Sequence, residues 1–238
     1  MQRLLRQSNL LHIQGVKMKN INIAIDGPSG AGKSSVAKAL SKSLGFLYVD
    51  TGAMFRAVAL YIYNNNIEND IENNLDNIKI RLEYINDCQH IYLCDKDVTN
   101  EIRQEKIGNL ASKFAAIAPV RNKLLELQRD IASKHNIVMD GRDIGSVVLP
   151  NADLKIFLTA SVEVRAKRRF DELVEKGISC NYEKIKADIE ARDYQDSHRQ
   201  TAPLVKAKDA IYLDSSNLCL EEVVDKIERI LNEKSSIS

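Results

Sequence analysis

The chain has 238 residues, of which 44% are hydrophobic and 28% are charged. This length allows one sizeable α/β domain with a small inserted subdomain, and the composition is that of an ordinary globular protein. The 34 basic and 33 acidic residues give a formal charge of +1. That balance excludes a surface that is basic throughout, so we expect binding neither to nucleic acid nor to an anionic membrane.

The chain has four cysteines, which are Cys88, Cys94, Cys180 and Cys219. They form no CxxC pair and no zinc-binding pattern, so we expect free thiols and a cytoplasmic location. The longest apolar run, residues 57–63, is far shorter than the roughly 18 residues of a membrane span. Residues 1–17 contain no signal-peptide core. We expect this segment to be a disordered N-terminal extension, unless translation starts at Met18.

The first part of the chain predicts a strand, a Gly-rich turn and a helix. Residues 21–26 are mostly apolar, which is typical of a buried parallel strand. Residues 32–44 have the spacing of an amphipathic helix, and Gly45 marks its end. A second short strand is predicted at residues 46–49, and a helix at about residues 53–63.

The next segment has a different pattern. Residues 64–77 are rich in Asn and acidic residues, which indicates a loop with a weak helical turn. Residues 78–83 and 89–94 alternate apolar with polar residues, as half-exposed antiparallel strands do. We therefore expect a small antiparallel β insert at about residues 77–105.

The rest of the chain predicts further helices and strands. Two helices are expected at about residues 106–117 and 119–134, the second with Pro119 at its start. The later elements are strands at 136–139, 154–158 and 210–213, and helices at 162–176, 182–192 and 220–231. Alternating strands and helices predict an α/β fold, with a parallel sheet, helices on both faces, and ligands at the carboxyl edge of the strands.

A phosphate-binding motif follows the first predicted strand. Residues 27–34, GPSGAGKS, fit the P-loop pattern GxxxxGK followed by Ser or Thr. Glycines let successive amide groups turn toward one anion, and the helix N-terminus adds its positive dipole end. Lys33 would reach the β- and γ-phosphates of ATP, and the Ser34 hydroxyl would bind Mg²⁺. The predicted ATP-binding residues are Gly27, Pro28, Ser29, Gly30, Ala31, Gly32, Lys33, Ser34 and Ser35.

The motif alone does not separate a kinase from a GTPase or a motor. A GTPase needs Asn-Lys-x-Asp to bind guanine, but Asn122 and Lys123 are followed by two leucines. A motor ATPase needs a longer chain. The class that remains is the small P-loop kinases.

Five segments resemble bacterial cytidylate kinases: IDGPSGAGKSS (25–35), DTGAMFRAVAL (50–60), DGRDIGSVVLP (140–150), KIFLTAS (155–161) and ARDYQDSHRQTAPL (191–204). The likeness covers about residues 18–231. It implies a P-loop kinase domain at 18–235, with a nucleoside monophosphate-binding insert at about 52–135 and an arginine-rich helical lid at about 161–200. It also implies phosphorylation of CMP and dCMP by ATP with Mg²⁺. Phe55 stands where the family often has Tyr, Ser146 stands where Thr is common, and the leader has no counterpart.

Two arginines are candidates for binding the acceptor phosphate. Arg56 follows the second predicted strand, and Arg142 follows the strand at 136–139. A guanidinium can bind a phosphate through two hydrogen bonds, so a converging pair could hold the acceptor in line with the γ-phosphate. No general base is required, because a phosphate monoester is already deprotonated at neutral pH.

The resemblance places Thr51, Arg121 and Asp143 around the cytosine base. A carboxylate accepts a hydrogen bond from cytosine N4 but would face a carbonyl in uracil. An ion pair with Arg142 or a loop cap is the structural alternative for Asp143. The residues that the resemblance places around the acceptor sugar are Ser112, Arg192, Asp196 and Arg199. A set of helix salt bridges is the alternative for the last three.

One predicted helix is crowded with the basic residues Arg165, Lys167, Arg168 and Arg169. Such a run is either a solvated face or, in small kinases, part of a lid over the phosphates. Arg165 and Arg169 are four residues apart and could face the site together, so we predict catalytic roles for both. Asp140, at the end of its strand, is a candidate for holding water bound to Mg²⁺.

Two other functions stay open. The chain could phosphorylate UMP or another small acceptor, although Thr51, Arg121 and Asp143 argue against this. It could also be a nucleotide switch or an ATPase, which would leave Arg56 and Arg142 without a purpose. The expected partners are ATP and CMP or dCMP, and the expected oligomeric state is a monomer.

Overall fold

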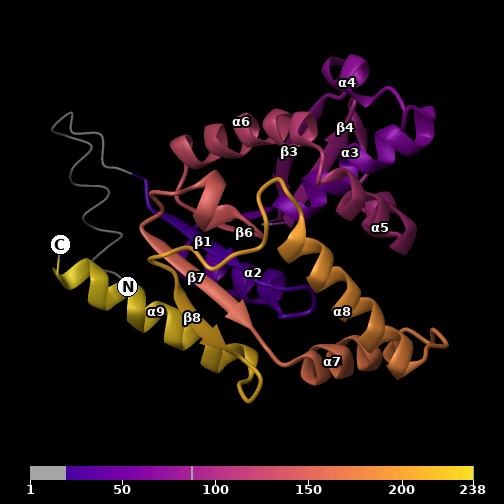
Figure 1. Cartoon of the computed structure of the whole chain (residues 1–238). Coiled ribbons are helices and arrows are strands. Elements are labelled where there is room, and N and C mark those ends of the chain that lie inside the picture. The colour runs from indigo at the N-terminus through magenta and orange to yellow at the C-terminus, as the bar shows by residue number, and fades with distance from the viewer. Residues whose placement is uncertain (1–19, 87, 238) are drawn as a thin grey trace, which may run out of the picture.

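The computed structural model describes residues 20–86 and 88–237, so the expected N-terminal extension at 1–17 lies outside it. Within these residues, five parallel strands form one sheet in the order β2-β6-β1-β7-β8 (Figure 1). The strands are β1 (Asn22–Asp26), β2 (Leu47–Asp50), β6 (Ile137–Gly141), β7 (Leu154–Thr159) and β8 (Ile211–Asp214). The predicted parallel sheet is thereby confirmed.

Helices cover both faces of this sheet, as predicted. The α-helices of the described chain, only some of which pack on the sheet, are α2 (Lys33–Leu44), α3 (Thr51–Asn65), α4 (Ile71–Asn74), α5 (Glu105–Phe114), α6 (Ala118–Lys134), α7 (Val162–Glu175), α8 (Tyr182–His198) and α9 (Leu220–Ile237). On one face, Leu40 of α2 and Ile227 of α9 share a core with the sheet. On the other face, Met54 of α3 and Leu124 of α6 do so. Burial of this apolar surface drives the layered packing. No helix in the described part of the chain is long and apolar enough to cross a membrane.

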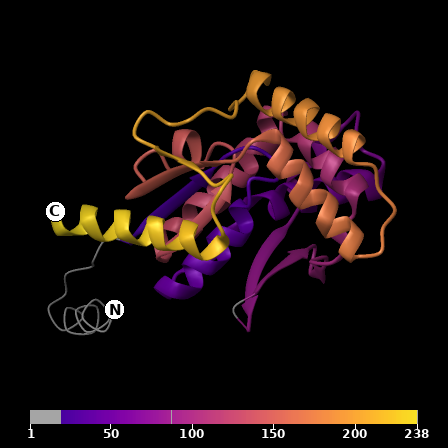
Figure 2. The ribbon, with the colours of Figure 1, turned by 90° about the horizontal axis from the view of Figure 1, so that it is seen from below.

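A small antiparallel sheet lies beside α3 (Figures 1 and 2). Its strands are β3 (Ile80–Ile85), β4 (Cys88–Leu93) and β5 (Lys96–Asp97). The predicted β insert is present, but β3 begins two residues after the predicted position 78, and β4 begins one residue before the predicted position 89. The turn between them includes Asn86, whose φ of 50° is one that Asn tolerates better than most residues. The two-residue strand β5 was not predicted.

Further elements differ from the sequence prediction, among them α9, which continues to Ile237 past the predicted end at residue 231. Helix α8 continues to His198, past the predicted end at residue 192, so Asp196 lies within it. A π-helical turn, η3 (Ile144–Val148), follows β6 and was not predicted. The Asp26 carboxylate accepts hydrogen bonds from the amides of Ile144 and Gly145, both at 2.7 Å. This carboxylate ties the end of β1 to the start of η3.

Helices α7 and α8 form an arm beside the carboxyl ends of the sheet strands (Figure 1). Each begins at a side-chain cap, Ser161 for α7 and Asn181 for α8. The turn between them contains Gly177 with φ 69°, a conformation in which glycine is favoured. The arm stands over the edge of the sheet where parallel strands place their ligands.

Candidate active site

A cleft of about 480 Å³ opens at the carboxyl edge of the sheet. The predicted residues that line it are Ser29, Gly30, Gly32, Lys33, Ser34, Ser35, Thr51, Arg56, Ser112, Arg121, Asp140, Arg142, Asp143, Arg165, Arg169, Arg192, Asp196 and Arg199. In the described chain, Gly27, Pro28 and Ala31 are not among the lining residues. The cleft thus brings together residues from most of the length of the chain.

The P-loop forms one wall of the cleft. Helix α2 begins after Gly32, whose φ is 86°, and has no side-chain cap. Its first amide groups therefore have no partner within the helix and can bind an anion. Lys33 is 6% exposed, and its ammonium donates to the Pro28 carbonyl at 2.7 Å. Burial, and next the charge of Arg142, lower the pKa of Lys33.

Asp140 lies at the base of this wall. The Ser34 hydroxyl donates to Asp140 Oδ2 at 2.8 Å, and the Tyr48 hydroxyl donates to Asp140 Oδ1 at 2.9 Å. Burial raises the pKa of Asp140, and the negative charge of Asp50 adds to the effect. A carboxylate and a hydroxyl at this point are oxygen donors of the kind that Mg²⁺ prefers. In the described residues no three His, Cys, Asp or Glu side chains are grouped to hold a metal ion, so the other Mg²⁺ ligands would be water and oxygens of bound phosphate.

Arg56 enters the cleft from α3. Asp50 caps this helix by accepting from the Ala53 amide at 2.8 Å, and it pairs with Arg56 Nη2 at 3.2 Å. A Cβ atom on Gly52 would lie 3.2 Å from both side chains, so glycine leaves room for the pair. The Thr51 hydroxyl donates to the Asp140 carbonyl at 2.7 Å. Arg56 is therefore held by the end of β2 and the first turn of α3.

Arg121 and Asp143 form a buried ion pair on the opposite side. Arg121 also donates to the Ala115 carbonyl at 3.0 Å, and its guanidinium lies 5.3 Å from the centre of the Phe55 ring. Arg199 Nη2 approaches the other oxygen of Asp143 at 3.7 Å. The alternative pairing of Asp143 with Arg142 is not what the structure shows. Asp143 keeps lone pairs that can accept hydrogen bonds from a ligand.

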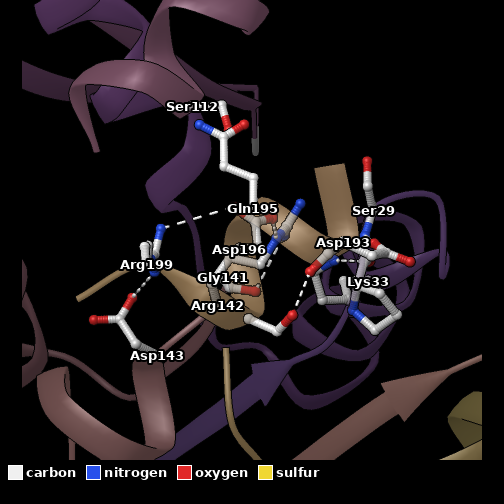
Figure 3. A network of polar contacts seen from close by, with 12 residues as sticks. Ser29, Lys33, Ser112, Gly141, Arg142, Asp143, Asp193, Gln195, Asp196 and Arg199 are labelled. Atoms are coloured by element: carbon white, nitrogen blue, oxygen red, sulfur yellow. Dashed lines mark hydrogen bonds and ion pairs between the residues drawn. The ribbon is translucent and has the colours of Figure 1, made fainter. Parts of the chain in front are cut away.

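Asp196 lies beside two arginines, Arg142 after β6 and Arg199 after α8 (Figure 3). It accepts from Arg142 Nε at 2.8 Å, and Arg199 Nη1 lies 3.8 Å from its other oxygen. Burial lowers the pKa of Arg192, as does the nearby charge of Arg142. Three buried guanidinium nitrogens have no hydrogen-bond partner among the described residues: Arg56 Nε, Arg192 Nε and Arg199 Nη2. Buried donors without partners suit an anionic or hydroxyl-rich ligand.

The remaining wall is the α7–α8 arm. Arg165 is 4% exposed and donates to the Ser29 carbonyl at 2.9 Å and to Asp193 at 2.6 Å. Arg169 pairs with Glu172 at 2.8 Å. Arg165 and Arg169 both line the cleft, as does Arg168. The arm is therefore hydrogen-bonded directly to the P-loop.

Sequence reasoning missed several residues of the cleft: Asp50, Gly52, Gly108, Ala111, Ala115, Arg168 and Glu172. Asp50 and Gly52 flank Thr51 at the end of a predicted strand, which was a usable signal. Arg168 belongs to the predicted basic helix, but the sequence does not show which of the neighbouring arginines face the cleft. The small residues of α5 carry no chemical signal. Ser112, which also lies on α5, has its hydroxyl 3.5 Å from Gln195 of α8.

A P-loop facing a wall of arginines and buried carboxylates defines the protein as a P-loop phosphotransferase with a second, anionic substrate. The family described as cytidylate kinase matches residues 23–233, and the chain belongs to that family. The protein is therefore a nucleoside monophosphate kinase.

Relatives are similar to this chain over nearly their whole length. Cytidylate kinase of Thermosipho melanesiensis is 51% identical over 217 residues, which is 90% of this chain and 98% of the relative. Cytidylate kinase of Lactobacillus johnsonii is 48% identical, over 92% of this chain and 99% of the relative. Cytidylate kinase of Caldicellulosiruptor saccharolyticus is 50% identical, over 88% and 95%.

Proposed function

We propose that the protein transfers the γ-phosphoryl group of Mg-ATP to CMP and dCMP, forming CDP and dCDP. The observation that carries the proposal is the cleft itself. Its P-loop wall offers uncapped amides at the start of α2, and its other wall offers buried guanidinium donors without partners. A donor triphosphate and an acceptor monophosphate would meet between the two walls.

On the donor side, the amides of the P-loop would bind the β- and γ-phosphates of ATP. Lys33 would turn from the Pro28 carbonyl, 2.7 Å away, to the phosphate oxygens. Ser34 and Asp140 would hold Mg²⁺ and its water together with those oxygens, and the ion would neutralise negative charge on the phosphates when bound.

On the acceptor side, Arg56 and Arg142 would bind the phosphate dianion from two directions. Each is already oriented by a carboxylate, Asp50 for Arg56 and Asp196 for Arg142. Because the acceptor phosphate is deprotonated at neutral pH, positioning and charge neutralisation are sufficient for the transfer. Arg165 and Arg169 would add positive charge from the arm and help to exclude water.

The base would lie against Asp143, with Arg121 and Thr51 beside it. Asp143 would accept from cytosine N4, whereas the O4 carbonyl of uracil would oppose its charge. The sugar would lie near Ser112, Arg192, Asp196 and Arg199, where Asp196 can accept from a ribose hydroxyl. A deoxyribose would lose one such contact but keep the phosphate and base contacts.

The proposed state is a monomer in the cytoplasm, acting on free nucleotides. The cysteines, which all lie in the described part, are free, as expected in a reducing compartment.

The test is the acceptor dependence of ADP formation. A coupled ADP-release assay would be run with Mg-ATP and, separately, CMP, dCMP, UMP, AMP or no acceptor. We expect turnover with CMP and dCMP, weak turnover with UMP, and none without acceptor. Equal ADP release in all reactions would contradict the proposal and indicate an ATPase.

A further inference from the structure

The outer edge of β2 is bound by side chains instead of by another strand. β2 is the terminal strand of the parallel sheet, and no other strand in the described chain pairs with its outer edge. On the inner side, Leu47 donates to the Asn136 carbonyl at 2.9 Å. Since successive residues of a strand point their backbone groups to opposite edges, those of Tyr48 and Asp50 face outward. Unpaired groups on such an edge need partners.

Two residues of the β3–β4 hairpin supply these partners. The Tyr84 hydroxyl donates to the Tyr48 carbonyl at 3.0 Å. Gln89 Oε1 accepts from the Asp50 amide at 2.9 Å, and Gln89 Nε2 donates to the Asp50 carbonyl at 3.4 Å. Tyr84 and Gln89 lie directly opposite each other in the hairpin register, so they act side by side. We call this pair the Tyr84–Gln89 clamp.

The clamp holds Asp50, which orients Arg56 at the proposed acceptor site. Both backbone groups of Asp50 are bound by Gln89, while the Asp50 side chain caps α3 and pairs with Arg56 at 3.2 Å. Arg56 Nε is buried and has no hydrogen-bond partner among the described residues. A shift of the Asp50 backbone would therefore displace the Arg56 guanidinium from the cleft wall.

We propose that Tyr84 and Gln89 are positioning residues for the acceptor nucleotide, acting through Asp50 on Arg56. The proposal rests on the assignment of Arg56 to the acceptor phosphate under the proposed function. No residue of β3 or β4 lines the cleft in the described chain, so the hairpin acts on the acceptor only through the strand it clamps. Among the described hydrogen bonds, Gln89 reaches no P-loop residue, so ATP binding should not depend on it. Tyr84 holds Tyr48, whose hydroxyl donates to Asp140, the partner of Ser34, so Tyr84 is linked to the ATP side as well.

The test compares KM for CMP with KM for ATP in single variants. Gln89→Ala removes both hydrogen bonds to Asp50, and Tyr84→Phe removes the bond to Tyr48 without changing the ring. We expect Gln89→Ala to raise KM for CMP by about three- to tenfold, the range for the loss of one or two neutral hydrogen bonds. Tyr84→Phe should raise it by about twofold. KM for ATP should stay at the wild-type value in Gln89→Ala.

His90→Ala is the matched control. His90 neighbours Gln89 on β4, but its ring is bonded to Asp97 of β5 at 2.9 Å and forms no hydrogen bond with β2 among the described residues. This variant should leave both KM values unchanged. Melting temperatures of all variants separate positioning from stability.

Three results would overturn the inference: an unchanged KM for CMP in Gln89→Ala, an equal rise in both KM values, or a lower melting temperature with unchanged kinetics. If the wild type does not phosphorylate CMP, the proposed function fails. The same comparison is then made with whichever nucleoside monophosphate the wild type accepts, so the clamp is still tested.

Discussion

The most informative single substitution is Asp143→Asn, because it removes the negative charge of the side chain and keeps its shape. Asp143 is 3% exposed, pairs with Arg121, and has Arg199 at 3.7 Å. Asparagine keeps the same size and one acceptor oxygen, but it replaces the second oxygen with an NH₂ donor. The proposed base contact therefore changes from a carboxylate, which opposes uracil, to an amide that can pair with either base.

The expected size of the effect follows from the strength of the bonds. A hydrogen bond to a charged group contributes about 1.5–3 kcal/mol, and a neutral one about 0.5–1.5 kcal/mol. Asp143→Asn should therefore cost about 1–2 kcal/mol on CMP, which is roughly a five- to thirtyfold fall in kcat/KM. The value of kcat/KM for UMP should fall less, because the amide can donate to the O4 carbonyl of uracil. The ratio of kcat/KM for CMP to that for UMP should therefore fall, by at most about five- to thirtyfold.

The assay measures kcat/KM for CMP and for UMP by coupled ADP release. Asp196→Asn is the control, since Asp196 contacts Arg142 at 2.8 Å and is assigned to the sugar. It should lower both values and leave their ratio unchanged. A parallel fall for CMP and UMP in Asp143→Asn would refute the reasoning, because Asp143 would then only hold Arg121.

Three further predictions concern the P-loop strand and its surroundings. Lys33→Met should lower kcat about a hundredfold or more. The free energy of unfolding should stay equal or rise, because the substitution removes a buried ammonium near Arg142. A lower free energy of unfolding would contradict this. Gly27→Ala should destabilise the fold by about 3 kcal/mol in denaturant unfolding. The φ of Gly27 is 152°, and a Cβ there would lie 1.9 Å from the Leu158 carbonyl oxygen. A denaturation midpoint equal to that of the wild type would contradict this. Burial raises the pKa of Asp26 from 3.8 to about 6, so the folded state binds this proton more tightly than the unfolded state. The contribution of Asp26 to stability therefore grows as the pH falls through 6 toward 4. The wild-type advantage over Asp26→Asn in free energy of unfolding should then be about 1 kcal/mol larger at pH 5 than at pH 7, and a constant difference would count against it.

The parallel core could be predicted because its signals are local. Strand β1 is an apolar run that ends at the Gly-rich loop, and α2 has an amphipathic spacing that ends at Gly45 with φ 67°. The π-helical turn η3 could not be predicted, because it depends on Asp26, which lies 118 residues earlier in the chain than Ile144. The predicted end of α8 at residue 192 is too early, because the hydrophobic spacing is weak beyond that residue, where ion pairs with arginines replace apolar packing.

The site could be predicted only where a motif identified it. Lys33 and Ser34 belong to a pattern whose spacing has a physical reason, while Thr51, Arg121 and Asp196 came from the resemblance. Asp193 was missed because its contacts, Arg165 at 2.6 Å and the Ser29 amide at 3.3 Å, join segments that are distant in sequence. Which arginine of α7 reaches the P-loop was likewise decided by tertiary packing.

The most direct test of the central claim is to follow the transferred phosphoryl group itself. ATP carrying a radiolabelled γ-phosphate would be incubated with the protein, Mg²⁺ and CMP, and the products separated by chromatography. The account predicts that the label appears in CDP, in amounts equal to the ADP formed. Label found in inorganic phosphate, with CMP unchanged, would contradict it.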